Sequence, residues 1–283
     1  MVRYDPDMGR PFISFLTDFG PDGPAPICRG VMLGIVPDAQ IVDIAHGVRK
    51  YAVRDGAYLL WCALPYMPVG IHVAVVDPGV GTERLPIALK AHRGDVLVGP
   101  DNGLLVPAAN RLGGIADARR LDNRSLMLPT TSSTFHGRDI FAPVAAHLAA
   151  GTAFEDVGPS IPPDTLVELR FPDPEVSEGV LRTSILYIDS FGNIRLAGEP
   201  ADLVQAVGDL DEGRRLSIEI EPANGAAPIT LEATWERTFG RTPVGATLAY
   251  QDSFGQLSLA DNQGDVAGRL NLAVGQTATV RST

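Results

Sequence analysis

The sequence predicts an α/β protein: an N-terminal Rossmann-like, mostly parallel sheet with flanking helices, followed by a smaller C-terminal β domain, either a barrel or a sandwich. In the first half, short continuous apolar runs alternate with stretches of helical spacing, which is typical of parallel strands buried on both faces. A proline-rich segment follows. Beyond it, short alternating runs are separated by glycine, asparagine and aspartate, which indicates an all-β unit.

The elements expected in the first half follow from hydrophobic spacing and from the residues that end each run. Prolines close the first two helices and Gly151 closes the third, as a C-terminal cap. The expected strands are residues 12–16, 40–44, 71–76, 87–90 and 95–98, and the expected helices are 27–35, 52–64 and 139–150.

The domain boundary is expected where proline is dense, because residues 157–177 contain five prolines among acidic residues. We expect an N-terminal domain at 1–160, a linker at 161–177 and a C-terminal domain at 178–283. Residues 1–160 carry 16 acidic and 14 basic side chains, whereas residues 161–283 carry 18 and 9, which also indicates two halves of different build. The expected C-terminal strands are 180–189, 216–221, 229–237, 246–251, 256–260 and 277–281, with no helix.

Composition excludes several classes of protein. The 283 residues carry a net charge of −11, which argues against a nucleic-acid partner, since that needs a basic face. No long apolar run predicts a membrane span, and the start has no apolar signal core. Cys28 and Cys62 form no metal or disulfide motif, and no histidine pair has ligand spacing. We therefore expect a cytoplasmic protein without a metal.

Acidic residues stand where several expected strands end. The first strand runs into Asp18, the third into Asp77, and the fifth into Asp101 and Asn102. Ligands of open parallel sheets bind outside the carboxyl ends of the strands. Each such residue alone can be a helix cap or a turn residue, but together they favour a ligand site.

Two more residues extend this edge. Arg84 lies seven residues beyond Asp77, across a glycine-rich turn that can fold it back beside the carboxylate. His136 immediately precedes the third expected helix. A converging aspartate, arginine and histidine can hold and polarise a water. For His136 alone, a surface or capping position is the alternative. No phosphate loop or complete dinucleotide fingerprint occurs, so no nucleotide cofactor is expected.

Four stretches surround these residues: VVDPGVGTER at 75–84, GPDNGLL at 99–105, TFHGRD at 134–139 and YIDSFGN at 187–193. Together they resemble the S-adenosyl-L-methionine hydroxide adenosyltransferase family, whose members hydrolyse S-adenosyl-L-methionine to adenosine and L-methionine. That family is related to fluorinases and chlorinases. The resemblance covers nearly the whole chain, from FISFLTDFG at 12–20 to SLADNQGDVA at 258–267.

The resemblance implies a C-terminal β-barrel and a homotrimer whose active sites lie between the N-terminal domain of one subunit and the C-terminal domain of its neighbour. It implies S-adenosyl-L-methionine as substrate, with no cofactor. Asp77, Arg84 and His136 match the set that manages the water. The matches to substrate-binding positions are Asp18 for the ribose hydroxyls, Asp189 and Ser253 for the methionine portion, Asn193, Phe191 and Phe239 for the adenine side, and Tyr51 where the halogenases carry a tryptophan.

The sequence departs from the pattern of the family or of its halogenase relatives at three places. Residues 21–26 are unusually rich in proline, Phe254 replaces an arginine of the halogenases, and the fluorinase insertion between Lys90 and Gly99 is absent. Two alternatives to hydrolysis stay open: a chlorinase-like halogenase that uses the same substrate, and a non-catalytic adenosine-binding protein. A purely structural trimer is a third interpretation, which the absence of any nucleoside binding would indicate.

Overall fold

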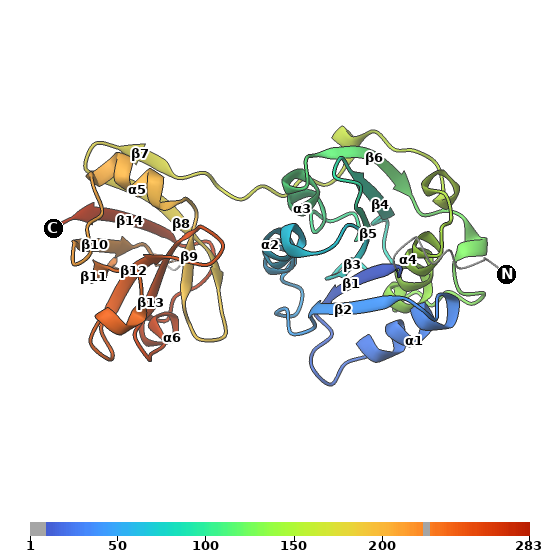
Figure 1. The fold of residues 1–283 in the computed structure, drawn as a ribbon, viewed down its shortest axis with the longest axis horizontal. Coiled ribbons are helices and arrows are strands. Elements are labelled where there is room, and N and C mark those ends of the chain that lie inside the picture. The colour runs from blue at the N-terminus through green and yellow to red at the C-terminus, as the bar shows by residue number, and fades with distance from the viewer. Residues whose placement is uncertain (1–9, 223–226) are drawn as a thin grey trace. The chain divides into compact units, whose positions relative to one another are not determined.

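The structure is a computed structural model that describes residues 10–222 and 227–283. The chain divides between Arg170 and Phe171 into two units, coloured blue to yellow-green and yellow to red in Figure 1. Each unit is described by itself. Among the described residues, every helix is too short or too polar to cross a lipid bilayer.

The first unit is built around a mixed six-stranded sheet with the strand order β2-β1-β3-β5-β4-β6. Strands β2, β1, β3 and β5 run parallel, whereas β4 is antiparallel to both neighbours, β5 and β6. The strands are β1 Phe12–Thr17, β2 Gln40–Ala45, β3 Ile71–Val75, β4 Pro86–Ala91, β5 Val96–Pro100 and β6 Ile115–Arg120.

Helices pack on both faces of this sheet, as Figure 1 shows. Helices α1 and α4 pack together on one face, where Ile13, Phe15 and Val73 contribute to a buried core. Helices α2 and α3 pack together on the other face. The helices are α1 Ala25–Ile35, α2 Val53–Ala63, α3 Val106–Arg111 and α4 Ala142–Ala149, the last preceded by a π-helix at Gly137–Phe141.

The mostly parallel sheet and the three expected helices are confirmed, with two additional elements and one change. Strand β6 and helix α3 were not expected, because β6 mixes charged with apolar residues and α3 has only six residues. The strand that departs from the parallel direction is β4, which the sequence did not single out. The third helix begins with a π turn. Pro24 and Pro26 in the proline-rich loop flank the start of α1, where a missing N–H costs no helical bond.

The second unit contains a closed barrel of seven strands, in the order β14-β10-β11-β12-β13-β9-β8, which closes through the β14–β8 pairing. Strand β7 adds to the outer side of β8. Leu181, Ile218, Leu259 and Val280 are among the side chains that fill the interior. The strands are β7 Glu175–Ser177, β8 Val180–Ile188, β9 Ile194–Leu196, β10 Arg215–Ile220, β11 Ile229–Trp235, β12 Thr247–Gln251, β13 Leu257–Asp261 and β14 Thr277–Ser282.

The expectation of a helix-free second unit is wrong, because α5 (Pro200–Val207) and α6 (Val266–Leu270) are helical. Both helices are short and lie among turn residues, so their spacing is hard to separate from that of loops. Local caps stabilise them. Glu199 and Asp202 form a reciprocal capping box at α5, and the Asp265 side chain accepts the Gly268 N–H at α6.

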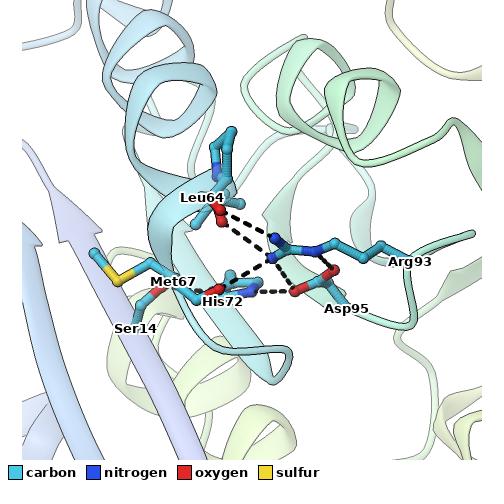
Figure 2. Close-up of polar contacts among 7 residues, drawn as sticks. Ser14, Leu64, Met67, His72, Arg93 and Asp95 are labelled. Atoms are coloured by element: carbon cyan, nitrogen blue, oxygen red, sulfur yellow. Dashed lines mark hydrogen bonds and ion pairs between the residues drawn. The ribbon is translucent and has the colours of Figure 1, made fainter. Parts of the chain in front are cut away.

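A buried polar network lies at the amino-terminal end of the parallel strands of the first sheet (Figure 2). Ser14 Oγ lies 2.7 Å from His72 Nδ1, and His72 Nε2 lies 2.9 Å from Asp95 Oδ1. Arg93 donates to both oxygens of Asp95, at 2.7 and 2.8 Å, and its Nη2 reaches the carbonyl of Leu64 at 3.0 Å. The network thus joins strands β1 and β3 to the end of helix α2.

Asp95 is the centre of this network, and its carboxylate has no exposed surface. Burial alone would raise its pKa, but the hydrogen bonds from Arg93 and His72 outweigh burial and hold the pKa well below its ordinary value. The stabilisation is therefore fully present above the unfolded-state pKa of about 3.9, and it is lost as the pH falls below that value.

We expect Asp95→Asn to lower the free energy of unfolding by about 3 kcal/mol, because buried donors of Arg93 and His72 then face an amide. Urea unfolding at neutral pH measures the loss. Asp122→Asn is the matched control: Asp122 pairs with Arg120 at the surface, where such a pair contributes less than about 1 kcal/mol. Equal losses in the two variants would contradict the role assigned to Asp95.

Candidate active site

The turns that follow β1, β3 and β5 lie side by side at the carboxyl edge of the first sheet. The backbone N–H of Asp18, after β1, donates to the carbonyl of Val75 at 3.3 Å. Asn102, after β5, donates its side-chain N–H to the carbonyl of Val76 at 2.8 Å. These cross-links place the acidic residues of the three turns at one edge, as the strand order requires.

Asp77, Arg84 and His136 are brought together at this edge. Arg84 Nε donates to Asp77 Oδ1 at 3.2 Å, and Arg84 Nη2 donates to Asp77 Oδ2 at 2.5 Å. The same Nη2 lies 3.0 Å from His136 Nδ1. The guanidinium carbon lies 5.3 Å from the centre of the Phe141 ring. Arg84 therefore joins the carboxylate and the imidazole into one set.

A tight turn with a glycine at position 81 brings Arg84 back beside Asp77. The Thr82 hydroxyl donates to the Gly79 carbonyl at 2.7 Å and closes the turn. Gly81 has a φ of +77°, and a Cβ there would lie 2.4 Å from the carbonyl oxygen of Ser133. The turn thus needs glycine both for its conformation and for its close contact with the segment that leads to His136.

The protonation of this set follows from its contacts. The side chains of Arg84 and Asp77 are 6% and 5% exposed. Burial, and next the positive charge of Arg84, lower the pKa of His136, so its imidazole is neutral at pH 7. Since arginine can only donate, Nδ1 must accept from Arg84, and the proton of the neutral ring lies on Nε2.

The set can hold a small oxygen nucleophile. His136 Nε2–H is a donor, and Arg84 Nη1 is buried without a hydrogen-bond partner among the described residues. The Asp77 oxygens retain lone pairs beyond those that Arg84 engages. Two donors and one acceptor in a desolvated setting suit a water that develops hydroxide character.

Asp18 and Tyr51 form a second pair in this unit. The Tyr51 backbone N–H donates to Asp18 Oδ2 at 2.9 Å. Tyr51 has a φ of +66°, an uncommon conformation for a bulky residue, and its side chain is 70% exposed. Among residues 10–222 and 227–283, the hydrogen bond to Asp18 is made to Oδ2, which leaves Oδ1 able to accept from a ligand.

In the second unit, Asp189 organises the turn that carries Phe191 and Asn193. Its Oδ1 accepts the backbone N–H groups of Phe191 and Asn193 at 2.9 and 3.0 Å, and its Oδ2 accepts the Asn193 side chain at 3.1 Å. Phe191 is 74% exposed, so its ring is accessible for stacking against an aromatic ring of a ligand.

Phe239 and Ser253 lie elsewhere in this unit. The Phe239 ring centre is 5.1 Å from that of Tyr250. Ser253 is exposed in a turn whose Asp252 accepts the Phe254 and Gln256 N–H groups.

The sequence offered no signal for Arg195, which joins the two turns of this unit. Its Nε donates to Asp252 Oδ2 at 2.7 Å, and its Nη1 lies 3.7 Å from Asp189 Oδ2. Only the fold brings the three residues together.

Ser14, His72 and Asp95 form a second arrangement of hydrolytic residue types, but all three are fully buried, and no substrate can reach them. The sequence did not predict this cluster, because its three residues lie far apart in the chain. The cluster has a structural role (Figure 2). Among the described residues, no group of three or more His, Cys, Asp or Glu side chains is arranged to hold a metal ion.

Comparisons with known proteins place the chain in a family. The family model "SAM hydroxide adenosyltransferase N-terminal domain" matches residues 13–158, and the model of the C-terminal domain of the same family matches residues 183–279. The two matches correspond to the two units.

Similar proteins include two named "(R)-S-adenosyl-L-methionine hydrolase". The one from Salinispora tropica is 43% identical, over 95% of this chain and 97% of its own. The one from Thermus thermophilus is 36% identical, over 93% and 96%. A fluorinase from Actinoplanes is 29% identical, over 97% and 99%. The crystal structure of an uncharacterized conserved protein from Thermotoga maritima superposes with a TM-score of 0.86 at 32% identity, over 95% and 99%.

We expect nitrogen NMR of protein labelled at histidine to find His136 neutral at pH 7, with the proton on Nε2, and to place its titration below the ordinary pKa of 6.5. Replacement of Arg84 by Met should raise that pKa, because the neighbouring positive charge is lost while Asp77 and Asp139 remain. A proton on Nδ1 at pH 7 would contradict the geometry.

Proposed function

Because the chain belongs to the SAM hydroxide adenosyltransferase family, we propose that it hydrolyses S-adenosyl-L-methionine to adenosine and L-methionine. Water attacks carbon 5′ of the ribose, the bond from that carbon to sulfur breaks, and methionine leaves with the electron pair. One proton is released. The observation that carries the proposal is the buried contact of Asp77, Arg84 and His136.

The chemistry matches what this set offers. A sulfonium departs as a neutral thioether and needs no acid, so the barrier lies in the weak nucleophile and in its alignment. Holding water in line with the carbon–sulfur bond can lower the barrier by several kcal/mol. Arg84 and His136 Nε2–H stabilise the developing hydroxide, and Asp77 accepts a hydrogen bond from the water.

Residues of both units bind the substrate in this proposal. Asp18 Oδ1 accepts hydrogen bonds from the ribose hydroxyls, while its Oδ2 is held by the Tyr51 N–H. The Asn193 amide and the rings of Phe191 and Phe239 bind adenine. Asp189 and Ser253 bind the methionine portion, and Tyr51 lies beneath the substrate.

We propose the (R) configuration at sulfur as the preferred substrate, because the similar hydrolases carry that epimer in their names. We also propose a homotrimer whose sites combine the first unit of one subunit with the second unit of its neighbour. The exposure of Tyr51 and Phe191 within one chain supports a site completed by another subunit.

Purified protein should convert (R)-S-adenosyl-L-methionine to equal amounts of adenosine and methionine, faster than it converts the (S) epimer. Arg84→Ala should lower turnover by about a hundredfold or more, because the hydroxide loses its charged donor. Chromatography of the nucleoside product measures both. Arg120→Ala removes a surface arginine of the same unit and should leave turnover unchanged.

Near-normal turnover of Arg84→Ala would exclude the assigned role. A halogenated nucleoside formed in chloride or fluoride would favour the halogenase alternative. Tight adenosine binding without any turnover would favour a binding protein.

Complementation tests the shared site. Arg84→Ala and Asn193→Ala subunits are each expected to be inactive, but together they should regain measurable activity after unfolding and co-refolding. In mixed trimers, some sites receive an intact first unit from one chain and an intact second unit from the other. Absence of activity in mixed oligomers that mass spectrometry detects would contradict the shared site.

A further inference from the structure

The Asp139 carboxylate is the most completely buried charge close to the water-handling set, and the proposed reaction does not use it. It has no exposed surface, and it lies three residues after His136, inside the π-helix. Its Oδ1 accepts from Arg138 Nε at 2.6 Å. Its Oδ2 accepts from Arg138 Nη2 at 3.1 Å and from the Ser132 backbone N–H at 2.8 Å.

These contacts close the segment that carries His136 into a loop. The Leu128 N–H donates to the Asp139 carbonyl at 3.0 Å, and the Ser132 N–H donates to its side chain. Leu128 and Ser132 are therefore both fixed to Asp139. Burial alone would raise the pKa of Asp139, but Arg138 and the Ser132 N–H outweigh burial and lower it, so the carboxylate stays charged and keeps its acceptors.

The same loop reaches the other half of the set. The carbonyl oxygen of Ser133, next to Ser132, packs against Gly81 so closely that a Cβ there would lie 2.4 Å away. Gly81 lies in the turn that brings Arg84 to Asp77. The Asp139–Ser132 contact therefore affects the position of Arg84 through Gly81. It affects the position of His136 through the loop of residues 128–139.

We propose that Asp139 is a positioning residue, which sets the distance between Arg84 and His136 by holding Ser132 in place. This inference rests on the proposed function, because positioning matters only if the set handles water. Misplacement of a reacting group by about 1 Å costs up to about a hundredfold in rate.

Asp139→Asn separates this role from a general structural one. The amide keeps the shape of the carboxylate but turns one acceptor into a donor. In either orientation, its N–H faces the Arg138 guanidinium or the Ser132 N–H. In Arg138→Met/Asp139→Asn, the arginine is gone, and the amide oxygen can accept the Ser132 N–H without conflict.

We expect Asp139→Asn to lower kcat by about tenfold or more, with KM and adenosine affinity nearly unchanged, because Asp18 and Asn193 are untouched. Nitrogen NMR should show His136 losing its single tautomer. The double variant should recover most of kcat and the wild-type His136 signals.

A kcat of Asp139→Asn within about threefold of wild type would overturn the proposal, and so would a double variant without recovery or a parallel loss of adenosine affinity. If Asp139→Asn fails to fold, Gly81→Ala displaces the same segment from the other side, and wild-type kcat in that variant would overturn the proposal. If the wild type shows no hydrolysis, the proposed function fails, while the His136 signals still report whether Asp139 holds the loop.

Discussion

The buried pair between Asp77 and Arg84 is the interaction on which the site depends. A charge taken out of water is costly unless a partner with good geometry compensates it, and here the guanidinium meets the carboxylate through two hydrogen bonds. The pair leaves Arg84 with enough donor capacity to fix the His136 ring through Nδ1. One electrostatic contact therefore decides the orientation of the carboxylate, the tautomer of the imidazole and the position of the remaining donors.

The fold supplies what this pair requires. The neighbouring parallel strands β1 and β3 bring Asp18 and Asp77 to one edge of the sheet. The turns that follow these strands are linked by the hydrogen bond from the Asp18 N–H to the Val75 carbonyl. Gly81, with its positive φ, lets the chain fold back and lets the Ser133 segment pack against it. At the opposite end of the same strands, the network around Asp95 provides stability where no ligand needs to bind. Stability and chemistry are thus placed at opposite ends of the sheet.

Sequence reasoning succeeded where local patterns reflect local physics. Apolar runs located most strands, the glycine-rich turn predicted that Arg84 folds back on Asp77, and His136 was expected beside a helix start. It did not identify β4 as the antiparallel strand, and it missed the short helices α5 and α6, because tertiary contacts decide these features. Arg195 and the Ser14–His72–Asp95 network were invisible for the same reason, because residues far apart in the chain meet only in the folded sheet or barrel.

We propose that Asp77, Arg84 and His136 together direct water onto carbon 5′ of the ribose. The most direct measurement is turnover in water enriched in oxygen-18, followed by mass spectrometry of both products. Adenosine should gain one heavy oxygen, at its 5′-hydroxyl, and methionine should gain none. Adenosine that forms without the label would contradict attack by water at that carbon, and with it the role assigned to Asp77, Arg84 and His136.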